Sequence, residues 1–229
     1  LLWTFTEREK LYDIFELICG ARFTTSYTRI GGVANDITDE VVQKIREWAI
    51  QLPKELKYFE GLVHKNKIFV DRVAGIGIIS KEKAVDLGLT GPTLRGCGVP
   101  RDLRKDQPYL VYDQLDFNVI TYPEGDVWAR YMVRIQEMKE SQKMILQILD
   151  KMPKGKVILN SPKTTLPRKQ EVYTNMESLI NDFMLINFGA APAIGETYTA
   201  IESPKGEVGF FIVSDGTGHP WKLKIRSPS

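Results

Sequence analysis

Apolar residues recur every three or four positions along much of the chain, a spacing that places them on one face of an α-helix. The first such stripe lies in residues 7–20 and consists of Leu11, Ile14, Phe15 and Ile18. The second lies in residues 38–59 and consists of Val41, Ile45, Trp48, Leu52, Leu56 and Phe59. Because Pro53 falls inside this segment and lacks the backbone N–H that a helix uses, we expect it to kink or divide the helix.

Further helices are predicted in the second half of the chain and just before it. Residues 126–150 carry the clearest stripe, which consists of Tyr131, Ile135, Met138, Ile145 and Leu149. Residues 176–188 (MESLINDFMLINF) form another helix, and a short one begins after Ser80, a good N-cap, and ends before Gly88. Residues 156–170 are rich in lysine and proline and are expected to form a connector.

The last forty residues change character and favour strands. ETYTAIES, EVGFFIVSD and WKLKIRS alternate or cluster residues typical of strands, and DGTGHP between the last two indicates a hairpin. The chain is therefore predicted to be α+β and mainly helical, with long helices followed by a small C-terminal antiparallel sheet. We expect one domain over residues 1–229, with a helical core at 1–190 and a β region at 191–229. Since it opens on LLWTF and stops after a strand-like run, we expect it to be a fragment of a longer chain.

Composition excludes several classes of function. The net charge of +2 argues against a dedicated nucleic-acid-binding protein. No apolar run reaches the ~18 residues that a membrane span needs, so the protein is expected to be soluble or peripheral. Its two cysteines lie 78 positions apart and it has two histidines, too few for a zinc or iron–sulfur site. Two free thiols are typical of a reducing, intracellular compartment.

Residues 93–117 (TLRGCGVPRDLRKDQPYLVYDQLDF) follow neither the helical nor the strand period. Four cationic side chains stand within eleven positions of this loop: Arg95, Arg101, Arg104 and Lys105. Long irregular segments in a compact protein are usually functional or disordered. Because Pro100 and Pro108 restrict the backbone, and three aromatic side chains supply apolar surface, we expect an ordered and functional loop.

The loop also contains four carboxylates, at Asp102, Asp106, Asp113 and Asp116. Their spacing matches no calcium loop and the neighbouring bases would repel a cation, so ion pairing is favoured over metal binding. The GIG at 75–77 and the GCG at 96–98 lack the third glycine of a dinucleotide fingerprint. His64 and His219 have no acidic or cysteine neighbour in sequence, and no catalytic arrangement emerges from the residues alone.

The segment GPTLRGCGVPRDLRKDQPYLVYD strongly resembles the signature segment of the large quinone-site core subunit of respiratory complex I. The resemblance extends over essentially the whole chain, through WTFTEREKLYDIFELICGAR, YTRIGGV, NMESLI and ETYTAIESPKGEVGFFIVSDGTGHPWKLKIRSPS. It implies the fold of the nickel–iron hydrogenase large-subunit core, to which this family is related, without the nickel-binding cysteines. It also implies a subunit of a proton-pumping NADH:quinone oxidoreductase that is not catalytic alone.

The resemblance further implies cofactors, partners and location. No cofactor or metal is expected on this chain; quinone is the substrate, and the terminal iron–sulfur cluster lies on a neighbouring small core subunit. The implied partners are that subunit, other peripheral-arm subunits and the membrane-arm subunit through which quinone enters; nucleic acid is not among them. The implied location is peripheral, on the cytoplasmic face of the bacterial inner membrane or on the matrix face of a mitochondrion.

Site residues follow from the same resemblance. The family's histidine and tyrosine ligands of the quinone headgroup lie upstream of Leu1, so no catalytic residue is assigned. The residues implied to border the quinone cavity or the cluster are Leu2, Arg22, Phe23 and Thr24. The residues expected to form an ion-paired network in an interface or cavity wall are Arg95, Asp102, Arg104 and Lys105.

Thr24 stands where many family members carry a histidine. A threonine can donate a hydrogen bond but carries no charge that titrates near neutral pH. We therefore expect a terminal cluster with a lower potential that depends weakly on pH, which would suit an acceptor such as menaquinone.

Two other functions remain open from the sequence. One is the large subunit of a membrane-bound, energy-converting nickel–iron hydrogenase, whose paired Cys-x-x-Cys motifs would lie outside this window. The close fit of the DLRK–PY–YD loop favours complex I. The other is a scaffold or nucleic-acid-binding module that uses the basic loop, which the near-neutral charge disfavours.

Overall fold

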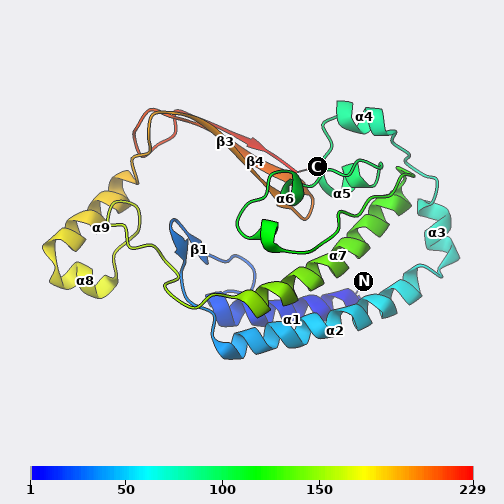
Figure 1. Cartoon of the computed structure of the whole chain (residues 1–229), viewed down its shortest axis with the longest axis horizontal. Helices are drawn as coiled ribbons and strands as arrows, with labels where there is room; N and C mark the ends of the chain where they lie inside the picture. The colour runs from blue at the N-terminus through cyan, green and yellow to red at the C-terminus, as the bar shows by residue number, and fades with distance from the viewer. Residues whose placement is uncertain (1, 229) are drawn as a thin grey trace. The chain divides into compact units, whose positions relative to one another are not determined.

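The computed structural model describes residues 2–228, and the side chains of residues 4–228. The chain divides into two compact units. The first contains Leu1–Trp48, Pro153–Glu196 and Ile212–Leu223, and the second contains Ala49–Met152, Thr197–Phe211 and Lys224–Ser229. The predicted α+β class is confirmed, since about half of the chain is helical and a small antiparallel sheet lies near the C-terminal end of the sequence (Figure 1).

The first unit begins with helix α1 (Leu2–Cys19), which starts five residues earlier than the predicted helix. Ile14 is buried as expected, whereas Phe15 is exposed, so the predicted apolar stripe is wrong at that position. A short antiparallel hairpin follows, with β1 (Thr28–Arg29) paired to β2 (Gly32–Val33). The connector pairs with this hairpin in an antiparallel bridge, in which the backbone N–H of Val33 donates to the carbonyl of Val157 at 3.0 Å.

Helices α8 (Lys169–Thr174) and α9 (Met176–Phe188) lie side by side in the same unit (Figure 1). The side chain of Asn175 accepts hydrogen bonds from the backbone of Glu177 and Ser178 and so begins α9. Gly189, with φ of 70°, ends it. The prediction of α9 is confirmed, whereas α8 was not predicted because its six residues are too short to show a helical period.

Helix α2 (Asp39–Val63) is one continuous helix through Pro53. The expected division at the proline is therefore wrong. A proline removes one hydrogen bond from a helix interior. Ala49 and Leu56, on either side of it, are both buried, and their packing retains the helical path.

The second unit contains most of the short helices. These are α3 (Lys67–Val73), α4 (Lys81–Asp86), α5 (Gly91–Arg95), α6 (Leu103–Asp106) and the 3-10 turn η1 (Tyr112–Gln114). Ser80 caps α4 as predicted, accepting from the backbone of Lys83. The loop at 93–117 is thus not wholly irregular, because the end of α5, α6 and η1 lie within it.

Helix α7 (Val127–Lys151) agrees with the prediction within one residue at each end, and it contacts α3 and α5. Its most buried face differs from the predicted stripe: Met138 is exposed, whereas Ala129, Val133, Ile135, Glu140 and Met144 are buried. Glu137 lies on the face of Val133 and Glu140, since the spacings are four and three residues. Two carboxylates therefore occupy a face that the apolar pattern alone does not reveal.

The sheet has the order β3–β4–β5, with β3 (Gly195–Ser203), β4 (Gly206–Ser214) and β5 (Lys222–Arg226). Within the second unit, the turn between β3 and β4 touches the start of α5. A Cβ on Gly91, whose φ is +64°, would lie 2.3 Å from the Cα of Gly206. Only glycine permits this approach. In the described part of the chain, no helix is both long and apolar enough to cross a membrane.

Candidate functional site

Arg95 is the centre of a buried ion-paired network in the second unit. It is the last residue of α5 and is only 1% exposed. Its Nε donates to Oε1 of Glu137 on α7 at 2.6 Å, and its Nη1 donates to Oε1 of Glu202 on β3 at 2.8 Å. Nη1 also donates to the carbonyl of Arg101 at 2.9 Å and lies 3.7 Å from Oδ2 of Asp102. One guanidinium therefore ties α5, α7, β3 and the loop together.

Asp102 and Arg104 form the second half of the network. Asp102 is 1% exposed, and its Oδ1 accepts from the backbone N–H of Arg104 at 3.0 Å, which caps α6. The Arg104 guanidinium binds the same carboxylate with two donors, Nε to Oδ1 at 2.9 Å and Nη2 to Oδ2 at 2.6 Å. This bidentate geometry is the strong and directional form of the arginine–carboxylate pair.

Lys105 does not join the network, although the sequence led us to expect an ion pair there. Its Nζ lies 4.3 Å from the centre of the Phe117 ring, and the Arg104 guanidinium lies 5.0 Å from the same ring. Phe117 is buried with Leu115 and Met144. Two cations are thus held against one aromatic ring, an arrangement that attracts through the ring quadrupole.

The charges of the network shift the pKa values of its carboxyls in opposite directions. Burial alone would raise the pKa of Asp102, but the hydrogen bonds and charge of Arg104, with the charge of Arg95, hold it below its usual range. Burial raises the pKa of Glu137, and Arg95 offsets this only in part. The Arg95 guanidinium contacts three carboxylates, and of these only Asp102 also forms an ion pair with Arg104.

Glu137 and Glu202, the two glutamates that complete the network, were not predicted from the sequence. Glu137 lies off the apolar stripe predicted for residues 126–150 and shares its helical face with a second carboxylate, Glu140. Glu202 carries no signal either. It lies 107 residues from Arg95 in sequence, and only the pairing of β3 with β4 beside the start of α5 brings it near.

The segment after α1 lies in the first unit and is exposed. Arg22 forms ion pairs with Glu9, Asp13 and Glu16 of α1, those to Asp13 and Glu16 spanning 3.0 and 3.5 Å. Phe23 is 71% exposed, with its ring 6.2 Å from that of Tyr12.

Thr24 is exposed next to Phe23. Leu2 begins α1, but its side chain lies outside the described residues. The structure therefore brings Arg22 and Phe23 onto α1.

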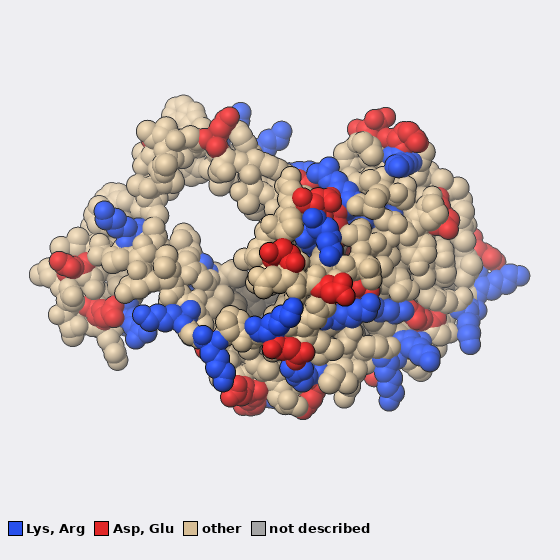
Figure 2. Space-filling view, in the orientation of Figure 1, with Lys and Arg blue, Asp and Glu red and all other residues tan. Residues whose placement is uncertain are grey.

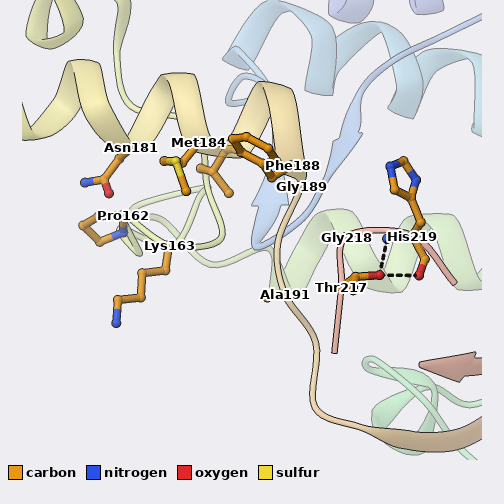
Figure 3. Close-up of a pocket in the computed structure, with 11 residues that line it drawn as sticks. Pro162, Lys163, Asn181, Met184, Phe188, Gly189, Ala191, Thr217, Gly218 and His219 are labelled. Carbon is orange, nitrogen blue, oxygen red and sulfur yellow. Dashed lines mark hydrogen bonds between the residues drawn. The ribbon is translucent and has the colours of Figure 1, made fainter. Parts of the chain in front are cut away.

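A cavity of about 490 Å³ lies in the first unit, between α9, the connector and the loop after β4. Its lining is mainly apolar and includes Met184, Leu185 and Phe188 (Figure 3). In that view the side chains of Lys163 and His219 lie on opposite sides and do not converge. Small-molecule sites usually present a few convergent polar groups, so this cavity does not have the form of a catalytic centre.

Three other kinds of site, for a metal ion, a reactive thiol or a nucleic acid, find little support in the part of the chain that the structure describes. Those residues contain no group of three or more histidine, cysteine or acidic side chains placed to hold a metal ion. Cys97 is buried, its Sγ donates to the carbonyl of Thr93 at 3.4 Å, and burial raises the pKa of its thiol. Basic and acidic side chains are interspersed on the face shown in Figure 2, unlike the single-sign surface typical of nucleic-acid binding.

Fold and site together define a class: an α+β protein with a buried, ion-paired loop at residues 95–104 that contacts a helix and a strand. Comparison with known sequences gives the family. The sequence model of the family described as "Respiratory-chain NADH dehydrogenase, 49 Kd subunit" matches residues 1–229, and the chain belongs to this family.

Individual relatives agree with the family match. The chain is 52% identical over 228 residues to an NADH-quinone oxidoreductase subunit of Chloroherpeton thalassium. It is 48% identical over 229 residues to the corresponding subunit of Salinibacter ruber and 51% identical over 228 residues to that of Methylacidiphilum infernorum. These alignments cover 100% of this chain and 52%, 51% and 54% of the relatives, so the chain spans about half of their length. The matched family is the one that the sequence resembles.

Proposed function

We propose that the chain is the quinone-site core of a proton-pumping NADH:quinone oxidoreductase. In this proposal the loop at 93–117 forms a rigid wall of the cavity that receives the quinone headgroup, beside the terminal iron–sulfur cluster of a neighbouring subunit. The chain is not catalytic alone, because it supplies the walls and polar groups of the site while the electrons arrive from the partner.

The observation that carries this proposal is the buried Arg95–Asp102–Arg104 network in the segment that most resembles the family signature. A cavity wall that borders a reacting, charged intermediate must hold its dipoles in place before the reaction. Arg95 and Asp102 are each 1% exposed and fixed by hydrogen bonds, so they cannot reorient freely. The family resemblance supports the rest of the proposal, since the relatives are named as subunits of NADH-quinone oxidoreductases.

The proposed partners and location follow from the same reasoning. The chain would contact a small subunit that carries the terminal cluster, other subunits of the peripheral arm and the membrane-arm subunit through which quinone enters. It would be peripheral, on the cytoplasmic face of a bacterial inner membrane or on the matrix face of a mitochondrion. Quinone is its substrate, and no cofactor is proposed on the chain itself.

A deletion and complementation experiment tests this function. Membranes from cells that lack the gene are expected to lose NADH-driven quinone reduction, and the full-length chain supplied in trans is expected to restore it. The reduction of a water-soluble electron acceptor at the NADH-oxidising subunits serves as the control and is expected to persist. Unchanged quinone reduction in the deletion strain would contradict the proposal.

A further inference from the structure

The buried network carries more negative than positive charge. Three carboxylates, from Asp102, Glu137 and Glu202, contact two guanidiniums, from Arg95 and Arg104. If all five groups were ionised, the cluster would hold one excess negative charge. An uncompensated charge in a buried site is costly, and proteins commonly avoid it by protonating one group.

Geometry selects Glu137 as the group that holds the proton. Asp102 accepts two guanidinium donors and the backbone N–H of Arg104. Glu202 accepts Arg95 at Oε1 and the backbone N–H of Leu103 at Oε2, 3.5 Å away. The contact of Glu137 with Arg95 uses only Oε1, so a proton on Oε2 leaves that hydrogen bond intact. The Glu137 side chain is 18% exposed, compared with 1% for Asp102 and 5% for Glu202, and so it is the carboxyl with the best access to solvent protons.

Charged groups face Glu137 from three packed elements. Arg95 lies on α5, Asp102 and Arg104 lie at the N-cap and in the first turn of α6, and Glu202 lies on β3.

On its own helix, the neighbours one turn away are engaged elsewhere. Arg134 donates to the carbonyl of Arg130 at 3.1 Å. Glu140 accepts from Lys143 at 2.6 Å and from the backbone of Asn118 at 3.1 Å. Lys143 therefore balances the charge of Glu140, and among the described residues no ion pair joins Arg134 to the three carboxylates of the network.

We propose that Glu137 is a proton-binding site of the ion-paired network, which takes up one proton from solvent at Oε2 and returns it without breaking its contact with Arg95. Its charge state then sets how firmly the loop is held, because ionised Glu137 is a third carboxylate charge around Arg95 and repels Asp102 and Glu202. In the quinone-site subunit this would place an exchangeable proton in the cavity wall, a consequence that rests on the proposed function.

The direction of the pH effect follows from linkage. Burial raises the pKa of Glu137 above its unfolded value, for which about 4.3 is typical of glutamate. The folded state therefore binds the proton more tightly, and the stability of the loop falls as the pH rises through the folded pKa. The pH effect of Asp102 on stability has the opposite sign, because its lowered pKa adds stability that is lost as the pH falls.

Infrared spectroscopy of the complex that contains the full-length chain tests the proposal. A pH titration of the wild type is expected to show a protonated carboxyl that persists above the range in which ordinary glutamates ionise. The Glu137→Gln variant is expected to lose this signal entirely. The Glu171→Gln variant is the matched control, because Glu171 is exposed on α8, and it is expected to keep the signal. A signal that survives in Glu137→Gln would overturn the proposal.

A second measurement needs no variant and so does not depend on whether Glu137→Gln assembles. Hydrogen exchange of the loop amides, corrected for the intrinsic effect of pH, is expected to accelerate in the wild type as Glu137 ionises. Protection that does not change over the same pH range would refute proton binding by Glu137. The infrared signal requires no turnover. A proton found on Glu137 in a complex that reduces no quinone would therefore support the site while contradicting the proposed function.

Discussion

Replacing Arg95 with methionine removes the central charge of the network while keeping a side chain of similar length. Glu137 and Glu202 would then lose the guanidinium that they share, whereas Asp102 would keep its bidentate contact with Arg104. The variant therefore separates the two halves of the network.

The size of the effect follows from burial. Removing one partner of a buried ion pair costs about 3–5 kcal/mol, because the remaining charge stays buried without compensation. Protonation of Glu137, whose pKa is already raised by burial, would relieve part of the cost, so we expect about 3 kcal/mol at neutral pH. A matched control is Arg101→Ala, because the Arg101 side chain is 54% exposed and contacts Glu207 at 3.5 Å. Glu207 is buried, but it also accepts from the Tyr198 hydroxyl at 2.7 Å, and its contact with Arg101 is long and open to solvent on the arginine side. We therefore expect a cost of about 0–1 kcal/mol, as for a surface pair.

Hydrogen exchange in the assembled complex measures this difference at the loop itself. The reporting amides are Tyr122, which donates to the carbonyl of Arg95 at 3.0 Å, and Gly125, which donates to that of Gly96 at 2.9 Å. Each 1.4 kcal/mol corresponds to about a tenfold change in an opening equilibrium, so Arg95→Met should accelerate exchange by about 100-fold and Arg101→Ala by at most about fivefold. Equal acceleration in the two variants would refute the claim that burial makes Arg95 the centre of the network.

Three further predictions follow from the structure and the resemblance. Gly91→Ala should destabilise the loop by at least about 2 kcal/mol more than Gly88→Ala. Both positions have positive φ, but only a Cβ at Gly91 would collide with the backbone of Gly206. Equal melting temperatures of the two complexes would contradict this. Thr24→His should introduce a pH dependence into the potential of the terminal cluster, measured by redox titration, and a strong dependence already present in the wild type near neutrality would count against the role of Thr24. Mass spectrometry of the purified complex with the full-length chain should find iron and no nickel, whereas about one nickel per chain would indicate hydrogenase chemistry.

The long helices were predicted because apolar residues recur at helical spacing over many positions. The helix over 126–150 was predicted within one residue at each end, although its buried face differs from the predicted stripe, and the helix at 176–188 was also predicted. The predicted division at Pro53 was wrong, because packing on both sides of the proline retains a helix that the missing N–H alone would disfavour. The short helix α3 was missed because seven residues show too little period.

The candidate site was predicted in part. The loop carries Arg95, Asp102 and Arg104 within ten positions, so their pairing was a reasonable expectation from local sequence. Glu137 and Glu202 come from a distant helix and strand, and only tertiary structure brings them to Arg95. The expected ion pair of Lys105 was wrong for a related reason, because the fold places its Nζ against the Phe117 ring and not against a carboxylate.

The most direct test of the central claim is the rate of NADH-driven quinone reduction by complexes that carry Arg104→Ala in the full-length chain. Removing Arg104 leaves the buried Asp102 carboxylate without its bidentate partner. We predict impaired assembly or, at equal amounts of assembled complex, slower quinone reduction than in the Arg101→Ala control. A normally assembled and fully active Arg104→Ala complex would contradict the account.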